Sequence, residues 1–178
     1  MGVNLSGGTS AGLKLRKFTS ESTALRYGVY TSYDHSKLSG DARHSNLLVS
    51  FAPGFEKHFA GTKRFSPYLG LTMPLSVRGA RYKSDLVVVK GSTSESYLDN
   101  NNRSYFGVRL NGLAGVDFYI AKNFYVGFEA GVGIGYRKYS DVEVEYKQEF
   151  TSNRTVEGYH GFNFGTFTTG GLRIGFVF

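Results

Sequence analysis

Hydrophobic side chains alternate with small or polar ones along almost the whole chain. A period of two is typical of β-strands that present one face to an apolar environment. We expect eight such strands, at about residues 3–5, 9–18, 23–35, 45–56, 69–77, 104–120, 124–136 and 161–178.

The last of these segments shows the pattern most clearly. Its even positions from Phe162 to Phe178 are mostly Phe, Thr, Leu and Ile, whereas glycine, Asn163 and Arg173 fall on its odd positions. Such a strand suits a closed barrel with lipid outside and a narrow lumen inside. The connections alternate between short and long, as they do in outer-membrane barrels. The sequence therefore predicts an all-β, eight-stranded antiparallel up-and-down transmembrane β-barrel. It would form one domain, residues 1–178, with both termini in the periplasm and the long loops outside the cell.

A soluble barrel around a ligand is the main alternative to a membrane barrel. The polar face of a soluble barrel would lie in water and would be rich in Lys, Glu and Thr. Here that face is rich in glycine, as at Gly131, Gly133 and Gly135. Glycine on a water-facing strand costs conformational entropy and gains nothing, whereas inside a narrow lumen it makes room for large side chains. This difference favours the membrane barrel.

The composition excludes several kinds of site. The 178 residues include 24 glycines and no cysteine, so neither a disulfide framework nor a thiolate metal site can form. The four histidines are too scattered for a metal site, and we expect no cofactor. The formal net charge is +7, but the basic residues form no run longer than residues 14–17, so we expect no nucleic-acid partner.

Charged residues fall on the face that would line the lumen. We expect them to form a structural network of ion pairs, because buried charges must be paired or stay wet. In this network Glu129 and Asp117 would meet Arg109, Arg173 or Arg78. An anion-selective pore is the alternative, but eight strands leave an interior just wide enough for side chains. The predicted network comprises Arg26, Glu56, Arg78, Arg109, Asp117, Glu129, Arg137 and Arg173, and Lys14 and Arg16 also point inward.

A catalytic arrangement is conceivable in the connection between the third and fourth strands. The pairs His35-Ser36 and His44-Ser45 flank this connection, with Asp34 and Asp41 nearby. A Ser/His/Asp set would fit a lipid-A-modifying enzyme. Serine and histidine are common in polar loops, however, and nothing in the sequence fixes the geometry that catalysis requires. We therefore expect a protein without enzymatic activity.

Two apolar runs interrupt the long polar loops 82–103 and 140–160. The first run is Leu86, Val87, Val88 and Val89, and the second is Val142, Val144 and Tyr146. The second run continues the outward parity of the seventh strand, which suggests that this strand projects beyond the membrane. We expect the two runs to pair into a ribbon above the barrel. The ribbon could offer an edge or an apolar patch to a partner, or the two runs could simply cover each other.

Three stretches carry a resemblance to known proteins: FEKHFAGTKRFSPYLGLTMPL (55–75), GVDFYIAKNFYVGFEAGVGIGY (115–136) and GGLRIGFVF (170–178). The chain resembles the small eight-stranded outer-membrane barrels of Gram-negative bacteria. It is most similar to those of Bacteroidota and to the outer-membrane protein X and opacity-like type.

The resemblance implies a location, partners and a role. The terminal aromatic strand would carry the signal read by the barrel-insertion machinery, at Leu172, Ile174, Phe176 and Phe178. Outer-membrane lipid and lipopolysaccharide would surround the barrel, and other outer-membrane proteins could bind it. The expected role is a structural or accessory subunit of a larger cell-envelope complex. The alternative is a surface adhesin or ligand binder that acts through loops 82–103 and 140–160.

Overall fold

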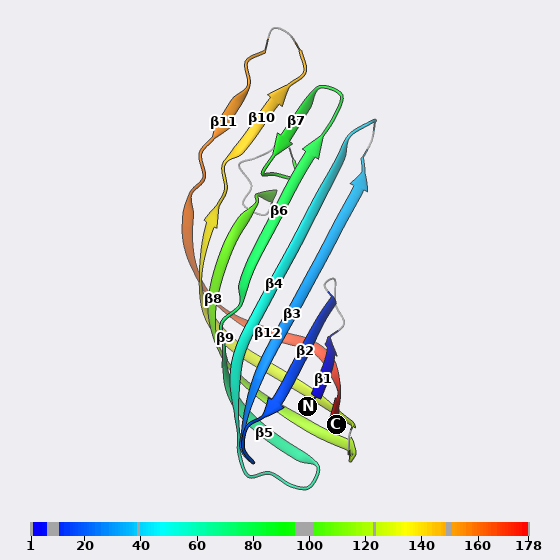
Figure 1. The fold of residues 1–178 in the computed structure, drawn as a ribbon, viewed down its shortest axis with the longest axis vertical. Helices are drawn as coiled ribbons and strands as arrows, with labels where there is room; N and C mark the ends of the chain where they lie inside the picture. Colours follow the sequence, from blue (N-terminus) through cyan, green and yellow to red (C-terminus); the bar gives the residue numbers. More distant parts are fainter. Residues whose placement is uncertain are drawn as a thin grey trace.

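The described residues of the chain fold into one antiparallel sheet of twelve strands (Figure 1). The computed structural model describes residues 2–6, 11–38, 40–94, 102–122, 124–148 and 151–177, with side chains described from residue 12 to residue 166 within these ranges. The first six strands are β1 (Gly2–Ser6), β2 (Ala11–Phe18), β3 (Thr23–Lys37), β4 (Arg43–His58), β5 (Phe65–Thr72) and β6 (Leu75–Lys83). The other six are β7 (Val87–Lys90), β8 (Tyr105–Ala121), β9 (Phe124–Tyr139), β10 (Val142–Tyr146), β11 (Arg154–Val156) and β12 (His160–Val177).

The sheet closes into a barrel because its first and last strands pair. β1 lies between β2 and β12, and the ring continues through β3 and β4 on one side and through β9 and β8 on the other. β5 and β6 both lie between β4 and β8, one above the other. The prediction of an all-β, antiparallel, up-and-down barrel is confirmed. Both ends of the chain lie at the same end of this barrel (Figure 1).

The single fifth strand that the sequence predicts is two strands in the structure. β5 ends at Thr72 and β6 begins at Leu75, with Met73 and Pro74 between them. Proline has no N–H for the ladder, so a central strand cannot run through it without a break. Backbone groups at the break still form hydrogen bonds, since the Met73 N–H donates to Pro53 O and the Pro74 carbonyl oxygen accepts from the Arg109 N–H.

The barrel wall continues upward as an open sheet, which we call the extension. It contains the upper parts of β3, β4 and β6 together with β7, β10 and β11, in the order β11-β10-β7-β6-β4-β3 (Figure 1). The predicted ribbon is confirmed, because Val144 of β10 pairs with Val89 of β7 and Tyr146 pairs with Val87. The two predicted long loops are therefore partly strands.

The parity predicted for the second apolar run is wrong by one residue. Tyr139, at the end of β9, and Val142, at the start of β10, are both buried, although only Ser140 and Asp141 separate them. An extra residue between two strand segments moves every later side chain to the opposite face. Val142 and Val144 are consequently buried, and Glu143 is exposed instead.

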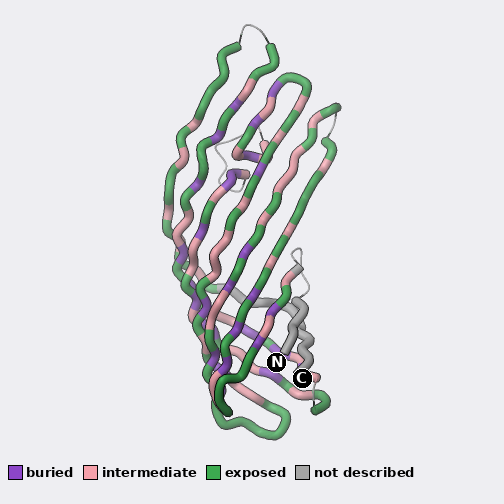
Figure 2. Tube along the Cα trace, viewed as in Figure 1, coloured by how far each residue is buried: buried purple, intermediate pink, exposed green. Residues whose placement is uncertain are grey.

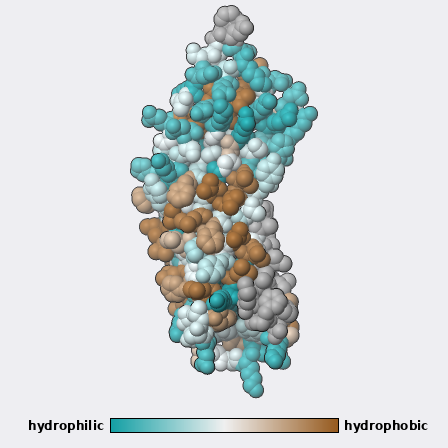
Figure 3. Space-filling model, viewed as in Figure 1, coloured by the Kyte–Doolittle hydropathy of each residue, from teal (hydrophilic) through white to brown (hydrophobic). Residues whose placement is uncertain are grey.

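The outer wall of the barrel carries an apolar band, and the predicted facing is confirmed. Buried and exposed positions alternate along the strands (Figure 2). Many large apolar side chains are exposed on the outer wall, among them Phe51 at 44% and Val132 at 40%. Figure 3 shows them as a band below the hydrophilic extension. No helix in the described ranges is long and apolar enough to cross a membrane.

The predicted insertion signal lies on β12, whose backbone closes the ring. Ile174 pairs with Val126 on β9 and with Leu5 on β1, and Phe176 pairs with Phe124 and with Val3. The register of β12 against β9 shifts between Thr169 and Arg173. The side chains of Leu172, Arg173, Ile174 and Phe176, and the whole of Phe178, lie outside the part of the chain whose side chains are described.

Candidate functional site

A compact set of ion pairs occupies the lumen of the lower barrel. We call it the lumen network, and it consists of Lys14 and Arg16 from β2, Arg26 from β3, Glu56 from β4, Asp117 from β8 and Glu129 from β9. None of these side chains is more than 7% exposed. They come from strands all around the ring, so they meet only because the sheet is closed.

Glu56 lies at the centre of the lumen network. Its carboxylate oxygens lie 2.5 Å from Arg16 Nε, 2.8 Å from Arg26 Nη1 and 3.4 Å from Lys14 Nζ. His58 Nε2 lies 3.4 Å from the second oxygen of the same carboxylate. A buried carboxylate needs this many positive or donor groups, since burial without them strongly disfavours its charge.

The remaining ion pairs span the lumen between strands that are not neighbours. Arg16 Nη1 lies 2.5 Å from Asp117 Oδ2, which joins β2 to β8. Lys14 Nζ lies 3.1 Å from Glu129 Oε2, and Arg26 Nη1 lies 2.9 Å from the same oxygen. The network therefore ties opposite walls of the barrel together.

Aromatic rings complete the packing around the network. The Arg16 guanidinium lies 5.0 Å from the Tyr68 ring centre and 5.7 Å from the Tyr125 ring centre, which is a favourable cation–π arrangement. The Tyr68 hydroxyl donates a 2.9 Å hydrogen bond to Glu129. The ring of Tyr68 takes the space beside Gly115, where any Cβ would collide with it. A glycine is required there because the ring needs that space.

The structure brings together some of the residues of the predicted network and places others at a different height. Arg26, Glu56, Asp117 and Glu129 do meet in the lumen. In the described part of the chain, the ion pairs of these carboxylates are formed with Lys14, Arg16 and Arg26.

Arg78, Arg109 and Arg137 lie higher in the barrel, beside neutral groups. Arg78 Nε donates to Asn46 Oδ1 at 2.7 Å, and Arg109 donates to Asn111, Asn163 and the carbonyls of Gly133 and Gly165. Arg137 lies 4.9 Å from the Tyr105 ring centre. Arg109 and Arg137 help line a cavity of about 80 Å³ at this level. The sequence placed all these arginines on the inner face, but it did not give their height along the barrel.

The charges of the lumen network balance, and this limits what the site can do. Among the residues whose side chains the structure describes, three cations face three carboxylates in this network. Ion pairs shorter than 3.5 Å join opposite walls, so side chains occupy the space that a channel would fill with water. Charged side chains therefore fill the lumen at this level of the barrel.

The extension has a small core of its own. Val87, Val89, Val142 and Val144 are at most 4% exposed, and Tyr82 and Val156 pack against them. Within the predicted partner surface, only Leu86 at 61% and Tyr146 at 40% are strongly exposed, and Val88 is half-buried. The alternative that the two apolar runs cover each other is therefore correct for the four valines.

Arg103 fastens the connection between β7 and β8 to this core. Its side chain is buried, and Nη2 donates to the carbonyl oxygens of Ser140, Val156 and Glu157 at 3.0, 3.4 and 3.0 Å. The guanidinium also lies 5.1 Å from the Tyr159 ring centre. Arg103 could not be singled out from the sequence, because a buried arginine in a polar loop has the same sequence pattern as a solvated one.

The charged face of the extension lies opposite the valines. Lys90 Nζ lies 2.5 Å from the half-buried Glu145 and 3.5 Å from the exposed Glu143, both on the neighbouring strand. The hydrogen bond to Glu145 and its negative charge raise the pKa of Lys90 above its ordinary value. Lysine already carries its charge at neutral pH, so this pair contributes no switch near physiological pH.

The possible Ser/His/Asp set does not have catalytic geometry. Asp34 lies between the other two side chains, with His44 Nε2 at 2.6 Å and Ser36 Oγ at 3.5 Å. In a catalytic triad the histidine lies between the serine and the carboxylate. Asp41 instead lies 3.8 Å from Lys37. Within the described ranges no group of His, Cys, Asp or Glu could hold a metal ion.

A shallow hollow marks the outer wall of the barrel within the apolar band. It measures about 630 Å³, and small residues such as Gly112, Ala114 and Gly131 form its floor. Phe55 and Leu71 are among the larger side chains around it. It opens outward from the barrel wall, so it is a feature of the apolar surface and not an enclosed ligand site.

The comparisons with known proteins agree with this architecture. Neither a curated protein nor a solved structure matches the chain. Residues 39–178 match the putative OmpA-OmpF-like porin family, a stretch that includes β4 to β12 and covers well over half of the sequence. An outer-membrane barrel accounts for the closed sheet and its exposed apolar band. The chain therefore belongs to the putative OmpA-OmpF-like porin family.

Proposed function

We propose that this outer-membrane barrel has a structural or accessory role and is a non-enzymatic subunit of a larger cell-envelope complex. In this proposal residues 1–178 act as one eight-stranded domain of the outer-membrane protein X and opacity-like type known from Bacteroidota. The extension would lie outside the cell and both termini in the periplasm. The surrounding partners would be outer-membrane lipid, lipopolysaccharide and, during assembly, the barrel-insertion machinery.

One observation carries the proposal: ion-paired side chains fill the lumen, while a sheet projects beyond the apolar band. A filled lumen argues against transport through the barrel. The features left for function are then on the extension. Its tip exposes Leu86 and Tyr146, whose backbones are adjacent because the Lys147 N–H bonds to Leu86 O. Exposed apolar residues grouped at a protruding tip are typical of protein-binding sites.

The edge of β3 offers a second contact for a partner. β2 pairs with β3 up to Thr31, and Ser32–Lys37 pair only with β4 in the described part of the chain. An unpaired strand edge can accept a strand from another protein. This feature suits a subunit that docks through its extracellular sheet.

The alternative is a surface adhesin or ligand binder that acts through residues 82–103 and 140–160. The same tip would then contact a molecule outside the cell and not another outer-membrane protein. A lipid-A-modifying enzyme is less well supported, because the Asp34, Ser36 and His44 arrangement lacks the histidine-centred order.

Extraction in a mild detergent, followed by identification of the bound proteins, tests the proposal. We expect a defined outer-membrane protein to co-purify with the wild-type chain and to be lost from the double variant Leu86→Ser, Tyr146→Ser. Phe59→Ser is the matched control, since Phe59 is 49% exposed in the opposite connection between β4 and β5. Recovery of the chain alone after cross-linking would contradict a role as a subunit and favour the adhesin.

A further inference from the structure

The outward face of the extension carries cations directly opposite one another. Lys37 on β3 pairs with Arg43 on β4, and Arg43 pairs with Lys83 on β6, so three positive side chains form one row. The next row down holds His35, Ser45 and Arg81 in the same register. We call Arg43, Arg81, Lys83 and Lys37 the basic cluster. Residues paired across a ladder share a face, so the four side chains lie side by side.

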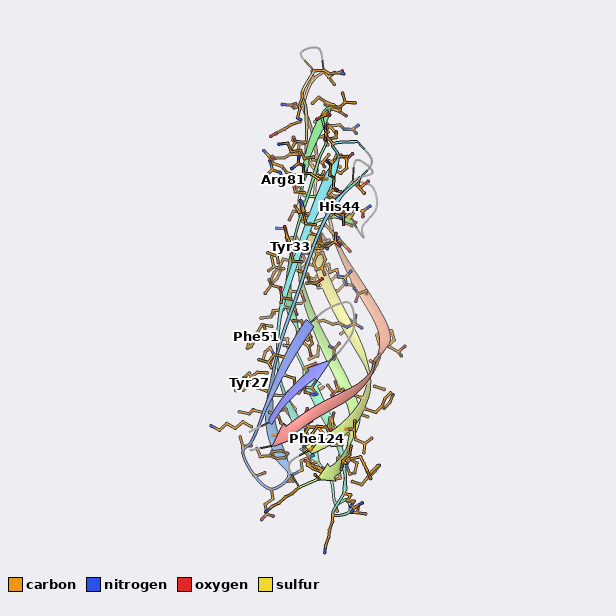
Figure 4. The ribbon with its side chains drawn as sticks, turned by 90° about the vertical axis from the view of Figure 1, so that its right-hand side faces the viewer. Tyr27, Tyr33, His44, Phe51, Arg81 and Phe124 are labelled. Carbon is orange, nitrogen blue, oxygen red and sulfur yellow. The ribbon has the colours of Figure 1, made fainter. Side chains whose placement is uncertain are left out.

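The basic cluster lies just above the apolar band on the same wall. Going down β4, Arg43 and Ser45 are followed by Leu47, Val49 and Phe51 on the same face, all three of them exposed. Arg43 is four residues above Leu47, which is about 14 Å along the strand and about 10 Å in height for a typical tilt. In Figure 4 Arg81 lies above Tyr33, with Phe51 and Tyr27 below.

Tyr33 marks the boundary between the band and the cluster. It is 68% exposed and stacks on His35, with 6.5 Å between the ring centres. Exposed tyrosines are enriched where lipid meets water. The cluster therefore lies at the height of the lipid head groups.

The basic cluster is short of negative charge. Lys37 lies 3.8 Å from Asp41, an exposed pair of small value. Within the described residues Arg43, Arg81 and Lys83 form no ion pair, whereas each cation of the lumen network has a carboxylate partner. Like charges placed directly across a ladder destabilise the pairing. An anion bound between the strands would reverse this cost.

The residues of the cluster also form a cleft. It measures about 200 Å³. Its lining residues are Arg43, Arg81, Lys83, Ser45, His35 and His44. A guanidinium group can bind two phosphate oxygens through parallel hydrogen bonds, which an ammonium group cannot do. Arg43 and Arg81 therefore suit this cleft to a phosphate group.

We propose that the basic cluster binds the phosphorylated head group of a glycolipid of the lipid A class in the outer leaflet, with its acyl chains along the apolar band below. The proposal rests on the membrane orientation given under Proposed function. A glycolipid fits because its phosphates lie at the membrane surface and its chains must run down the wall. A soluble phosphate would use only the upper half of this surface.

Native mass spectrometry in detergent tests the proposal, with purified lipid A as the probe. We compare the wild-type chain with the triple variant Arg43→Gln, Arg81→Gln, Lys83→Gln. The control triple variant is Lys63→Gln, Arg64→Gln, Lys122→Gln, which removes the same charge from exposed turns at the other end of the barrel. We expect a loss of roughly 100-fold in lipid A affinity for the first variant, because each basic residue near an anionic lipid surface contributes about fivefold. The control should bind as the wild type does.

Three further results separate the possible outcomes. Dephosphorylated lipid A should bind weakly, and inorganic phosphate at millimolar concentration should not displace lipid A. Equal binding of phosphatidylglycerol, or equal affinity of both triple variants, would overturn the glycolipid site. Insertion into lipid vesicles, followed by heat-dependent gel mobility, is measured separately for each variant. Failure of all variants, including the wild type, to insert would instead contradict the assignment as a membrane barrel on which the proposal rests.

Discussion

At the scale of single residues, Glu56 holds together most of the lumen network. Replacing it by glutamine keeps the shape but removes one of the three carboxylates, so Lys14, Arg16 and Arg26 would share two negative charges. Breaking a buried ion pair from one side typically costs about 3–5 kcal/mol. We expect Glu56→Gln to lower the free energy of unfolding by about that amount in a urea titration in lipid vesicles. Glu143→Gln, on an exposed pair, should change it by less than about 1 kcal/mol. A small effect at Glu56 would show that the network does not stabilise the barrel.

Val132 and Gly133, which are neighbours on β9, test the outward and inward faces of the barrel wall. Val132 is exposed on the apolar band, so Val132→Arg should lower the free energy of unfolding by about 2–4 kcal/mol. Ile120→Arg, beside the short β8–β9 turn, should cost at most about 1 kcal/mol because arginine is tolerated near the membrane surface.

Gly133→Ala should also be destabilising, but for a reason inside the lumen. A Cβ at Gly133 would collide with Asn111 Oδ1 and lie 2.7 Å from Arg109 Nε. The same unfolding titration measures these variants. A neutral Val132→Arg combined with a tolerated Gly133→Ala would contradict the assigned facing.

At the scale of elements, Arg103 connects the extension to the barrel. Lysine in its place keeps the charge, but its ammonium lacks the planar, pre-organised guanidinium that reaches the three carbonyl oxygens while it stacks on the Tyr159 ring. We expect Arg103→Lys to lower the free energy of local opening of β7 and β10 by about 2 kcal/mol, since hydrogen bonds from charged donors contribute about 1.5–3 kcal/mol. Hydrogen exchange of the Val89 and Val144 amides should therefore become faster, while amides of β4 within the apolar band keep their rates. Arg154→Lys on exposed β11 is the control. Equally faster amide exchange in the Arg103→Lys and Arg154→Lys variants would contradict a specific role for Arg103.

The sequence predicted the elements more completely than their ends. The alternation along residues 23–35 and 45–56 predicted β3 and β4 with the correct facing. In a long strand with one polar and one apolar side, every residue contributes to the alternating pattern. The same period could not reveal the extra residue between Tyr139 and Val142, since the apolar pattern resumes in either register. The break at Pro74 was readable from proline chemistry, but the apolar residues on both sides of it masked the signal.

The lumen network could be predicted in kind but not in detail. Alternation placed Arg26, Glu56, Asp117 and Glu129 inside, where they are found. Which charged side chains pair depends on how the strands are staggered around the closed ring, and the sequence of a single strand does not specify that stagger. For this reason Lys14 and Arg16, on a short strand, took the places expected of Arg78 and Arg109.

At the scale of the whole molecule, the lumen network predicts a closed barrel. Purified protein in a planar lipid bilayer should show no steady conductance, because charged side chains from opposite walls meet in the lumen. Removing several of these side chains at once, as in Arg16→Ala with Glu56→Ala and Glu129→Ala, should give brief openings in chains that still insert. Stable, ion-selective conductance of the wild type would contradict the role of the network as a plug.

The orientation of the whole molecule decides whether the extension faces the outside of the cell. The chain has no cysteine, so one cysteine at a time can be introduced without background. Asp41→Cys and Asp85→Cys lie in exposed turns of the extension, whereas Lys63→Cys and Lys122→Cys lie in exposed turns at the opposite end. A maleimide that cannot cross membranes should label the first pair on intact cells and the second pair only after the outer membrane is opened. The strands of the extension lie at one end of the barrel, and the short turns and the paired strands β1 and β12 lie at the other. Outer-membrane barrels have their short turns in the periplasm, so we expect the extension to face outward. Labelling in the reverse order would place the basic cluster against the inner leaflet and Leu86 in the periplasm, so a glycolipid site and an extracellular docking tip would both become untenable.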